Sequence, residues 1–443
     1  MWSHTGEDNI LSFKENVSDK DFVDDKVVKI AIEILNIGYV CNRCLGRAFG
    51  KLLHGITNER RGIIIRDFIA LLLDAGVKID VRMENFQDYD FRRLQKTPYG
   101  ERKCSVCENI FVDIIPKLSE EAIKKVRAYE FRTFLVGTIL NKTFYEKDEL
   151  LLKISPEYGE SIKDEINREV GKRLEEKYGR TVDHEDPQLL IIFDLKKLEV
   201  EIKSKSLFIY GGYKKLVRGI PQTTWHCRRC RGRGCRACGW KGKMYRTSVQ
   251  QIIGNPLLKM SKGEKSSFHG SGREDVDVRC LDYRPFIIEI SNPRRRDLDL
   301  QKILSEINKS KFVKVDSLRY TDKGEVTHIK EAKADKTYKA IVTFKRPLKQ
   351  LDKLTSLNGA KIAQQTPLRV LARRADILRE RKINKVEFRR LTRFKAEIVV
   401  ECEAGTYVKE LISGDNGRTK PNVADILGNE VKNILLDVIK IDK

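Results

Sequence analysis

Cysteine spacing is the feature that most constrains how this chain folds. Eight of the ten cysteines form four C-x-x-C pairs: Cys41/Cys44, Cys104/Cys107, Cys227/Cys230 and Cys235/Cys238. Two thiolates separated by two residues on a tight turn can face one ion, so two such pairs complete a tetrahedral zinc shell. Disulfides are the alternative, and they need an oxidising compartment. Residues 1–22 lack the basic start and apolar core of a secretory signal, so we expect a cytoplasmic protein that binds structural zinc.

The two predicted zinc sites differ in how much chain they join. The first links pairs that lie sixty positions apart, from Cys44 to Cys104, as a structural metal site does. The second packs four ligands between Cys227 and Cys238, which requires sharp turns at the glycines among them. That segment is also dense in arginine and lysine. We therefore expect a Cys-rich finger (residues 221–247) that is stiffened by metal and contacts phosphates.

The charge balance points to a polyanionic partner. The 443 residues carry 87 Lys+Arg against 64 Asp+Glu, a formal net charge of +23. Neutralised phosphates release counterions, which gives basic proteins sequence-independent affinity for nucleic acid. The alternative is the solvated, charged surface of a heat-adapted protein. Residues 62–77 are the most apolar helical stretch, but they include charged residues and are too short to span a bilayer.

Periodicity predicts an α+β protein with four segments. Residues 1–129 have a mostly helical pattern, including a helix at 61–75, and contain the first two cysteine pairs. Residues 130–220 mix a charged helix at 157–179 with strands at 132–140, 189–195, 198–204 and 206–213. The finger follows. Residues 248–443 intersperse strands with helices at 298–308, 348–357 and 422–427, which predicts a mixed, largely antiparallel sheet.

Three separated segments contain residues suited to catalysis. Asp275 and Asp277 follow a Gly-Ser-Gly turn in FHGSGREDVDVR, and Tyr407 and Lys409 lie in AGTYVKEL. Tyr338 lies in KTYKAIVTF, where alternation places it on one face with Ala340, Val342 and Phe344. Each has a simpler interpretation alone: a solvated turn acid, or a core tyrosine at a strand end.

Together, these segments resemble the pseudouridine synthases. GRED resembles the R-x-D loop that bears the nucleophilic aspartate, and GTYVKEL resembles the motif that supplies its basic partner. The strings RPFIIEISNP, QQTPLRVLARR and GDNGRTKPN extend the likeness to the tRNA pseudouridine synthase family of archaea and eukaryotes. In that family, the catalytic domain follows a zinc-bearing N-terminal region with a THUMP-like fold. The resemblance covers residues 266–443 and implies a THUMP-like RNA-binding region at 130–220 and a catalytic domain at 248–443.

The resemblance also implies roles for individual residues. Asp275 would be the nucleophile and Asp277 supportive, while Lys409 would pair with the Asp275 carboxylate. At position 409 this chain has lysine where the wider superfamily has arginine. Lysine provides a point charge but lacks the planar guanidinium that can bind a carboxylate through two hydrogen bonds. Tyr338 would lie against the target base. Further substrate contacts would come from Arg273, Tyr407 and Leu411.

The reaction requires residues of these types. Conversion of uridine to pseudouridine breaks the bond from N1 to C1′, turns the base and joins C5 to the sugar, so no organic cofactor is needed. A carboxylate can act at C1′, by substitution or by helping glycal formation, or at C6. It must be ionised and close, which a nearby ammonium group favours. The target uridine must flip out of its stack, and a tyrosine can replace the lost stacking. The base that removes the C5 proton can be tyrosinate, Asp275 or water. The resemblance implies uridines 54 and 55 of the tRNA T-loop as targets.

Two other classes of function compete with this interpretation. A zinc-stabilised tRNA-binding protein or chaperone would explain the charge and the cysteines, but would leave Asp275, Tyr338 and Lys409 without a role. A THUMP-bearing thiolase or methyltransferase needs a nucleotide or AdoMet site, and the sequence has no P-loop. The G-x-G-x-x-A match inside the finger follows no predicted strand. We therefore expect a tRNA pseudouridine synthase, and a monomer is favoured.

Overall fold

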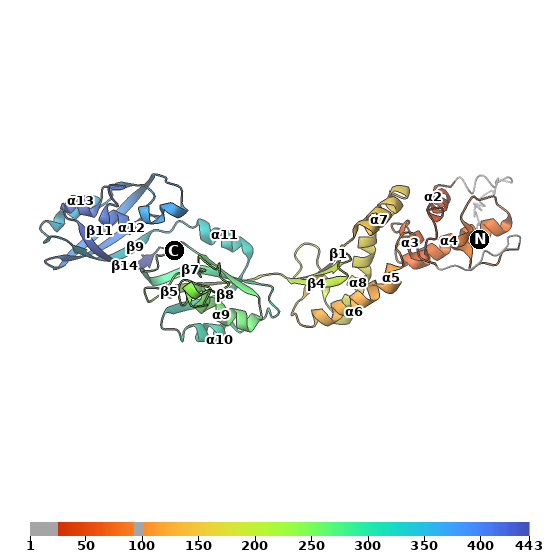
Figure 1. Ribbon diagram of the computed structural model, residues 1–443, viewed down its shortest axis with the longest axis horizontal. Coiled ribbons are helices and arrows are strands. Elements are labelled where there is room, and N and C mark those ends of the chain that lie inside the picture. Colours follow the sequence, from red (N-terminus) through yellow and green to blue (C-terminus); the bar gives the residue numbers. More distant parts are fainter. Residues whose placement is uncertain (1–24, 93–101, 443) are drawn as a thin grey trace, which may run out of the picture. The chain divides into compact units, whose positions relative to one another are not determined.

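The computed structural model describes residues 25–92 and 102–442, and the chain divides into two compact units, 1–203 and 204–443 (Figure 1). The residues on which the secretory-signal prediction rests, 1–22, lie outside the described part. No helix within the described ranges is both long and apolar enough to cross a bilayer. The finer segment boundaries expected from the sequence remain predictions.

Helices dominate the first part of the first unit. They are α2 (Lys26–Leu35), α3 (Asn42–Arg47), α4 (Asn58–Ala75), η1 (Met83–Phe86), α5 (Ile110–Asp113) and α6 (Ile115–Val126). The helix predicted at 61–75 is confirmed and begins one turn earlier. It starts there because the Thr57 hydroxyl accepts the Arg60 amide at 3.2 Å, and it ends at Gly76 with φ +96°.

A small sheet completes this unit. Its strands and helices are β1 (Thr133–Ile139), α7 (Lys142–Ile154), α8 (Ile162–Tyr178), β2 (Thr181–Val182), β3 (Leu189–Asp194) and β4 (Glu199–Ser204). The strand order is β2-β1-β3-β4, with β1 parallel to both neighbours. One hydrophobic cluster runs from Ile30 on α2 to Val200 on β4 and includes cysteines of the first predicted zinc site. The cysteine-bearing segment and the sheet therefore share a core.

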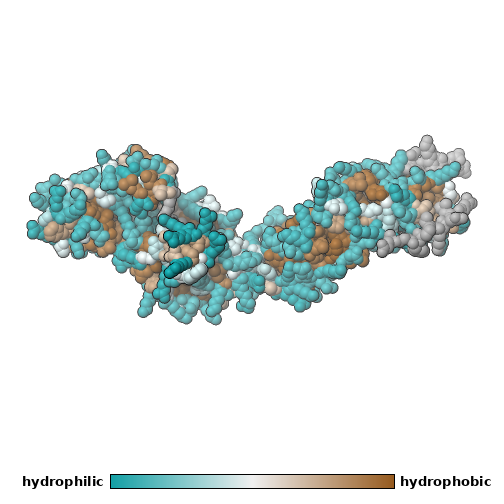
Figure 2. All heavy atoms as spheres, viewed as in Figure 1, coloured by the Kyte–Doolittle hydropathy of each residue, from teal (hydrophilic) through white to brown (hydrophobic). Residues whose placement is uncertain are grey.

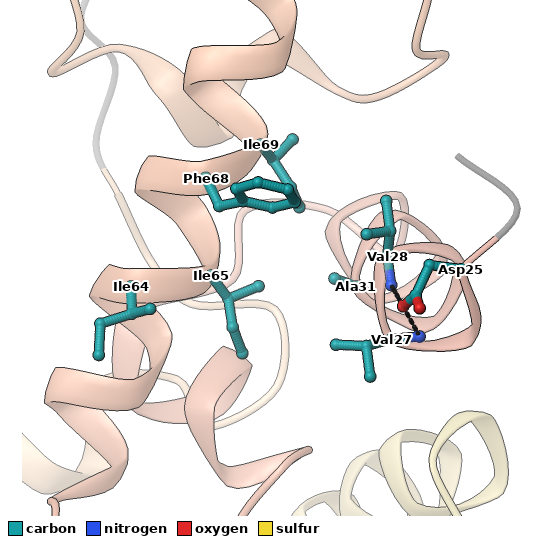
Figure 3. A pocket seen from close by; sticks show the side chains of 8 residues that line it. All are labelled: Asp25, Val27, Val28, Ala31, Ile64, Ile65, Phe68 and Ile69. Carbon is teal, nitrogen blue, oxygen red and sulfur yellow. Dashed lines mark hydrogen bonds between the residues drawn. The ribbon is translucent and has the colours of Figure 1, made fainter. Parts of the chain in front are cut away.

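An apolar pocket of about 410 Å³ lies between α2 and α4 (Figure 3). Its walls are aliphatic and aromatic, with Ile64 and Phe68 contributed by α4. Asp25 is the one charged residue in its lining, and its carboxylate accepts the Val27 amide at 2.8 Å as the N-cap of α2. The carboxylate thus has a structural role, and the pocket offers no group suited to catalysis.

The second unit is built on one large mixed sheet. Its strands are β5 (Leu207–Lys215), β6 (Lys265–Gly270), β7 (Arg279–Ser291), β8 (Val313–Thr321), β9 (Lys336–Phe344), β10 (Lys361–Gln364), β11 (Arg379–Thr392), β12 (Lys395–Cys402), β13 (Thr419–Lys420) and β14 (Val431–Ile441). The order is β13-β10-β11-β12-β9-β14-β7-β5-β8, with β6 also on β7. Its pairings are antiparallel except where β14 meets β7, so the predicted mixed, largely antiparallel sheet is confirmed.

The helices and 3-10 helices of this unit lie between its strands in the sequence. They are η2 (Arg236–Cys238), α9 (Val249–Ser261), α10 (Leu300–Ile307), α11 (Lys323–Glu331), η3 (Leu351–Leu357), η4 (Leu368–Arg373), α12 (Val408–Ser413) and α13 (Val423–Leu427). α9 and α10 pack over Ile209 and Ile288, whereas α11 packs over Phe208 and Ile287 on the opposite face. Most of the face visible in Figure 2 is hydrophilic.

Two local predictions need correction. The strand expected at 206–213 in the THUMP-like region is β5, which pairs with β7 and β8 in the large sheet of the second unit. Alternation identifies a strand but not its partners, which here lie 65 or more positions away in the sequence. The helix expected at 348–357 is shorter, because only Leu351–Leu357 forms a 3-10 helix.

Candidate active site

A cleft of about 700 Å³ opens in the second unit where segments far apart in the sequence meet. Most of its lining comes from the 271–278 loop between β6 and β7, strand β9, η4 and the start of α12, and the rest comes from the finger, β7 and β14. Its lining includes Trp225, Arg273, Glu274, Asp275, Asp277, Arg284, Lys336, Tyr338, Arg369, Arg374, Tyr407, Lys409, Leu436 and Val438. The fold therefore brings together the three segments that sequence analysis selected.

Asp275 is held by two cations. Its carboxylate oxygens lie 2.8 and 2.9 Å from Nη1 of Arg369, and Oδ2 lies 3.3 Å from Nζ of Lys409. The side chain is 36% exposed, so it remains reachable from the cleft. The two cations fix the position of the carboxylate in the cleft. The predicted contact between Lys409 and Asp275 is present.

Lys409 is shared between two carboxylates. Its ammonium group lies 2.7 and 2.8 Å from the oxygens of Asp277, closer than its contact with Asp275. Burial alone would raise the pKa of Asp277, but the hydrogen bond and charge of Lys409 outweigh it and lower the pKa below its usual value. Asp277 thus holds the ammonium group beside Asp275, which agrees with a supportive role.

Arg369 is a partner of Asp275 in the cleft that sequence reasoning missed. Its Nε donates to Glu410 at 2.6 Å while Nη1 contacts Asp275, so one guanidinium bridges two carboxylates. Burial would lower its pKa, but these two partners raise it. Arg369 lies in QQTPLRVLARR, which carried the family resemblance without a role for its arginine. The motif was recognised in the sequence, but the contact of Arg369 with Asp275 was not predicted, because the two residues lie 94 positions apart.

A buried ionic cluster supports the 271–278 loop. Glu274 is 5% exposed; its carboxylate accepts the Tyr213 hydroxyl at 2.8 Å and lies 3.1 Å from Nε of Arg284. Nζ of Lys215 lies 3.8 Å from Glu274 and donates to the main-chain oxygen of Asp275 at 2.9 Å. Burial lowers the pKa of Lys215, and the Glu274 charge opposes that shift. This cluster, also missed in the sequence, fixes the backbone that positions Asp275.

The aromatic residues line the cleft. Tyr338 is half-buried on β9, on the face it shares with Ala340, Val342 and Phe344, as alternation predicted. Burial raises the pKa of its hydroxyl. The Tyr407 hydroxyl accepts a hydrogen bond from Arg374 at 2.9 Å.

Two predicted substrate contacts have different surroundings. The guanidinium of Arg273 lies over the ring of Trp225, 5.3 Å from its centroid, and both side chains line the cleft. Leu411 is fully buried in the hydrophobic core and does not line the cleft. It lies on α12 four residues after Tyr407, on the face that packs inward, so the structure places it beneath the site rather than against substrate.

Each predicted cysteine quartet forms a compact group. The four Sγ atoms of Cys41, Cys44, Cys104 and Cys107 lie within 4.8 Å of one another, as do those of Cys227, Cys230, Cys235 and Cys238. Measured pairs are 3.7 Å in the first group and 3.8 to 3.9 Å in the second. Four thiolates about 2.3 Å from a tetrahedral ion would be about 3.8 Å apart.

Main-chain hydrogen bonds to sulfur also favour a metal ion in both cysteine groups. The amide of Cys41 donates to Cys104 Sγ at 3.3 Å, and the amides of Gly234 and Gly242 donate to Cys230 and Cys238 at 3.2 Å. Such donors stabilise thiolates and orient them toward an ion. The residues in both groups therefore fit a metal ion.

Comparisons with known proteins point to one class, the pseudouridine synthases. Residues 208–442 match the family model "Pus10, C-terminal", and residues 118–194 match "Pus10 THUMP domain, archaeal". A protein from Methanothrix thermoacetophila named tRNA pseudouridine synthase Pus10 is 38% identical, over 96% of this chain and 97% of that protein. Its namesake from Methanocaldococcus jannaschii is 40% identical, over 93% and 94%. The chain belongs to the Pus10 family, and the predicted synthase and THUMP resemblance is confirmed.

Proposed function

We propose that this enzyme isomerises uridine to pseudouridine in the T-loop of tRNA, at positions 54 and 55, with Asp275 as the nucleophile. The observation that supports this most directly is the Asp275 carboxylate, reachable from the cleft and held by Arg369 at 2.8 Å and Lys409 at 3.3 Å. The THUMP-like region and the net charge of +23 favour tRNA as the substrate. We further propose that it acts as a monomer in the cytoplasm.

The chemistry follows from the groups around the cleft. The uridine flips into it, and the Asp275 carboxylate acts at C1′ while the bond from C1′ to N1 breaks and its electron pair stays on the base. The freed base turns, and C5 bonds to C1′ as Asp275 is released. The C5 proton is removed and N1 gains a proton, so uridine and pseudouridine have the same composition. Burial raises the pKa of the Tyr338 hydroxyl, which disfavours tyrosinate as the base. We assign the Tyr338 ring to stacking on the flipped base, and removal of the C5 proton to Asp275 or water.

An unmodified tRNA transcript tests the proposal. Carbodiimide modification followed by primer extension should reveal pseudouridine at positions 54 and 55, and replacing either uridine by cytidine should remove only that signal. Binding is measured on the same samples. Tight binding without any product would instead support the non-catalytic tRNA-binding protein or chaperone.

Tyr338 variants should separate stacking from proton transfer. Phenylalanine retains the ring, so we expect Tyr338→Phe to keep the rate within roughly tenfold of wild type, whereas Tyr338→Leu should lose about a hundredfold or more. Single-turnover rates on the transcript measure both. Equal, large losses in the two variants would show that the hydroxyl is the essential group.

We also propose that both cysteine quartets bind structural zinc and that the enzyme uses no organic cofactor. Bound zinc would supply a cross-link between chain segments and take no part in the reaction. The sulfur spacing and the main-chain donors to sulfur support this assignment.

Metal analysis should therefore find two equivalents of zinc per chain. Cys104→Ser and Cys235→Ser should each lose one, but with different consequences. Cys104 is buried in the core of the first unit, so its loss should lower the unfolding temperature sharply, whereas the finger variant should change it little. Less than one equivalent in pure wild-type protein would contradict the zinc assignment.

A further inference from the structure

One buried arginine ties the first cysteine quartet to the THUMP-like region. Arg47 is the last residue of α3, three positions after Cys44, and its side chain is 0% exposed. Its Nη2 donates to Cys44 Sγ at 3.9 Å. Its other nitrogens form ion pairs with Asp148 of α7, and with Glu165 of α8 at 3.5 Å. One guanidinium therefore lies between a proposed metal ligand and two carboxylates of the THUMP-like region.

Asp148 also holds the start of α8. Its two carboxylate oxygens each accept the amide of Ile162, the first residue of that helix, at 3.1 Å. Asp148 is 6% exposed and Glu165 is 1% exposed. A carboxylate buried to this extent is costly unless a cation pairs with it. The first turn of α8 therefore depends on the charge of Arg47.

Main-chain contacts join the same two parts of the chain. The Glu160 amide donates to the Arg47 carbonyl at 3.0 Å, and the Ser155 hydroxyl donates to the Ala48 carbonyl at 2.6 Å. Both donors lie in the turn between α7 and α8. The C-terminal end of α3 is thus held against this turn by side-chain and main-chain contacts.

The helix that carries Arg47 depends in turn on the cysteines. α3 has six residues, and its N-cap is Cys41. So short a helix is not stable on its own. A metal ion held by Cys41 and Cys44 would fix both the N-cap and the middle of α3, and the Cys44 thiolate would give Arg47 a charged acceptor. The position of Arg47 therefore depends on whether metal is bound.

We propose that Arg47 couples metal binding at the first quartet to the start of α8, so that this part of the THUMP-like region is more ordered when metal is bound. With metal bound, α3 holds Arg47 between Cys44 and Asp148. Without metal, α3 loosens, Arg47 leaves its two carboxylates, and the first turn of α8 opens. Such a coupling is reciprocal, so the contacts at the start of α8 also strengthen metal binding. This inference rests on the proposed zinc and is independent of the reaction.

Zinc affinity of the full protein tests the coupling at the start of α8. A Cys235→Ser background removes the second site, so competition with a chelator then reports the affinity of the first quartet alone. In this background Asp148→Asn should weaken zinc binding by roughly tenfold, because the amide keeps the shape of the side chain but removes the charge that holds Arg47. The contact of Asp148 with the quartet runs through Arg47, so the metal ligands themselves stay intact.

Asp194→Asn is the matched control for this measurement. Asp194 also belongs to the THUMP-like region, is 8% exposed, and accepts the amides of Lys196 and Lys197 at 2.9 and 3.2 Å. Its substitution weakens the same region through contacts that do not involve Arg47, so zinc affinity should change by less than about twofold. An unchanged affinity with Asp148→Asn, or an equal loss with both variants, would overturn the inference.

Hydrogen exchange in the same background tests the coupling from the metal side. Removal of zinc should speed exchange at residues 161–165 by roughly tenfold or more, while β3 keeps most of its protection. Unchanged exchange at 161–165 would show that metal and α8 are not coupled. An equal loss of protection in β3 would show that the whole unit unfolds without metal. Either result overturns the inference.

These readouts involve neither RNA nor catalysis. A wild-type protein that shows the coupling but forms no pseudouridine would refute the proposed function and leave this inference standing. A first quartet that binds no zinc would refute both the zinc assignment and the coupling.

Discussion

Asp275→Asn should reduce pseudouridine formation by at least about a thousandfold while leaving tRNA binding within about threefold of wild type. Asparagine has nearly the same shape but cannot act as a carboxylate nucleophile. The side chain is 36% exposed, and Arg369 keeps its second partner, Glu410, so the fold should tolerate the change. Single-turnover assays on the unmodified transcript, with binding measured in parallel, give both quantities.

Asp277→Asn is the matched control for this prediction. It removes a carboxylate two residues away that contacts Lys409 but not Arg369, and its side chain is 64% exposed. Lys409 would then turn fully to Asp275, so we expect a loss of roughly tenfold or less. If Asp277→Asn abolished the reaction and Asp275→Asn did not, the nucleophile would be Asp277 rather than Asp275.

Glu274→Gln should destabilise the second unit by about 3–5 kcal/mol. The glutamate is the acidic partner of Arg284 and Lys215, which are 1% and 0% exposed. A neutral amide of the same size leaves both cations buried without a counter-charge. Urea unfolding followed by tryptophan fluorescence in a Trp2→Phe background reports this unit, because Trp225 and Trp240 both belong to it.

Glu430→Gln provides the comparison for the buried glutamate. Glu430 pairs with Lys345 at the surface, where the two side chains are 68% and 56% exposed. Exposed ion pairs contribute at most about 1 kcal/mol to the free energy of unfolding, so the midpoint of urea unfolding should change little. Equal effects of the two substitutions would show that the buried cluster is not what holds the catalytic loop.

Local patterns predicted many elements of the fold. Alternation located β9 and placed Tyr338 on the face of Ala340 and Val342, and helical spacing located α4 within one turn. These features depend on residues close in sequence. The cysteine pairs also predicted both quartets, because C-x-x-C spacing already fixes half of each ligand set.

The proposed catalytic residues required more than local pattern. Asp275, Tyr338 and Lys409 each had an ordinary structural interpretation, and only their joint resemblance to a family connected them. The structure adds the physical connection, since one cleft is lined by all three. Leu411 shows the limit of motif transfer, because a neighbouring position in the same motif points into the core.

The sequence by itself determined many of the elements, the two cysteine quartets and the family, because each depends on residues at short, regular spacing. Only the tertiary structure decided that β5 joins the second unit, that Arg369 meets Asp275 and that Lys215 with Glu274 supports the catalytic loop. These contacts join residues about sixty or more positions apart. These contacts are stabilised by burial and charge pairing in the folded chain, so the local periodicity of the sequence does not predict them.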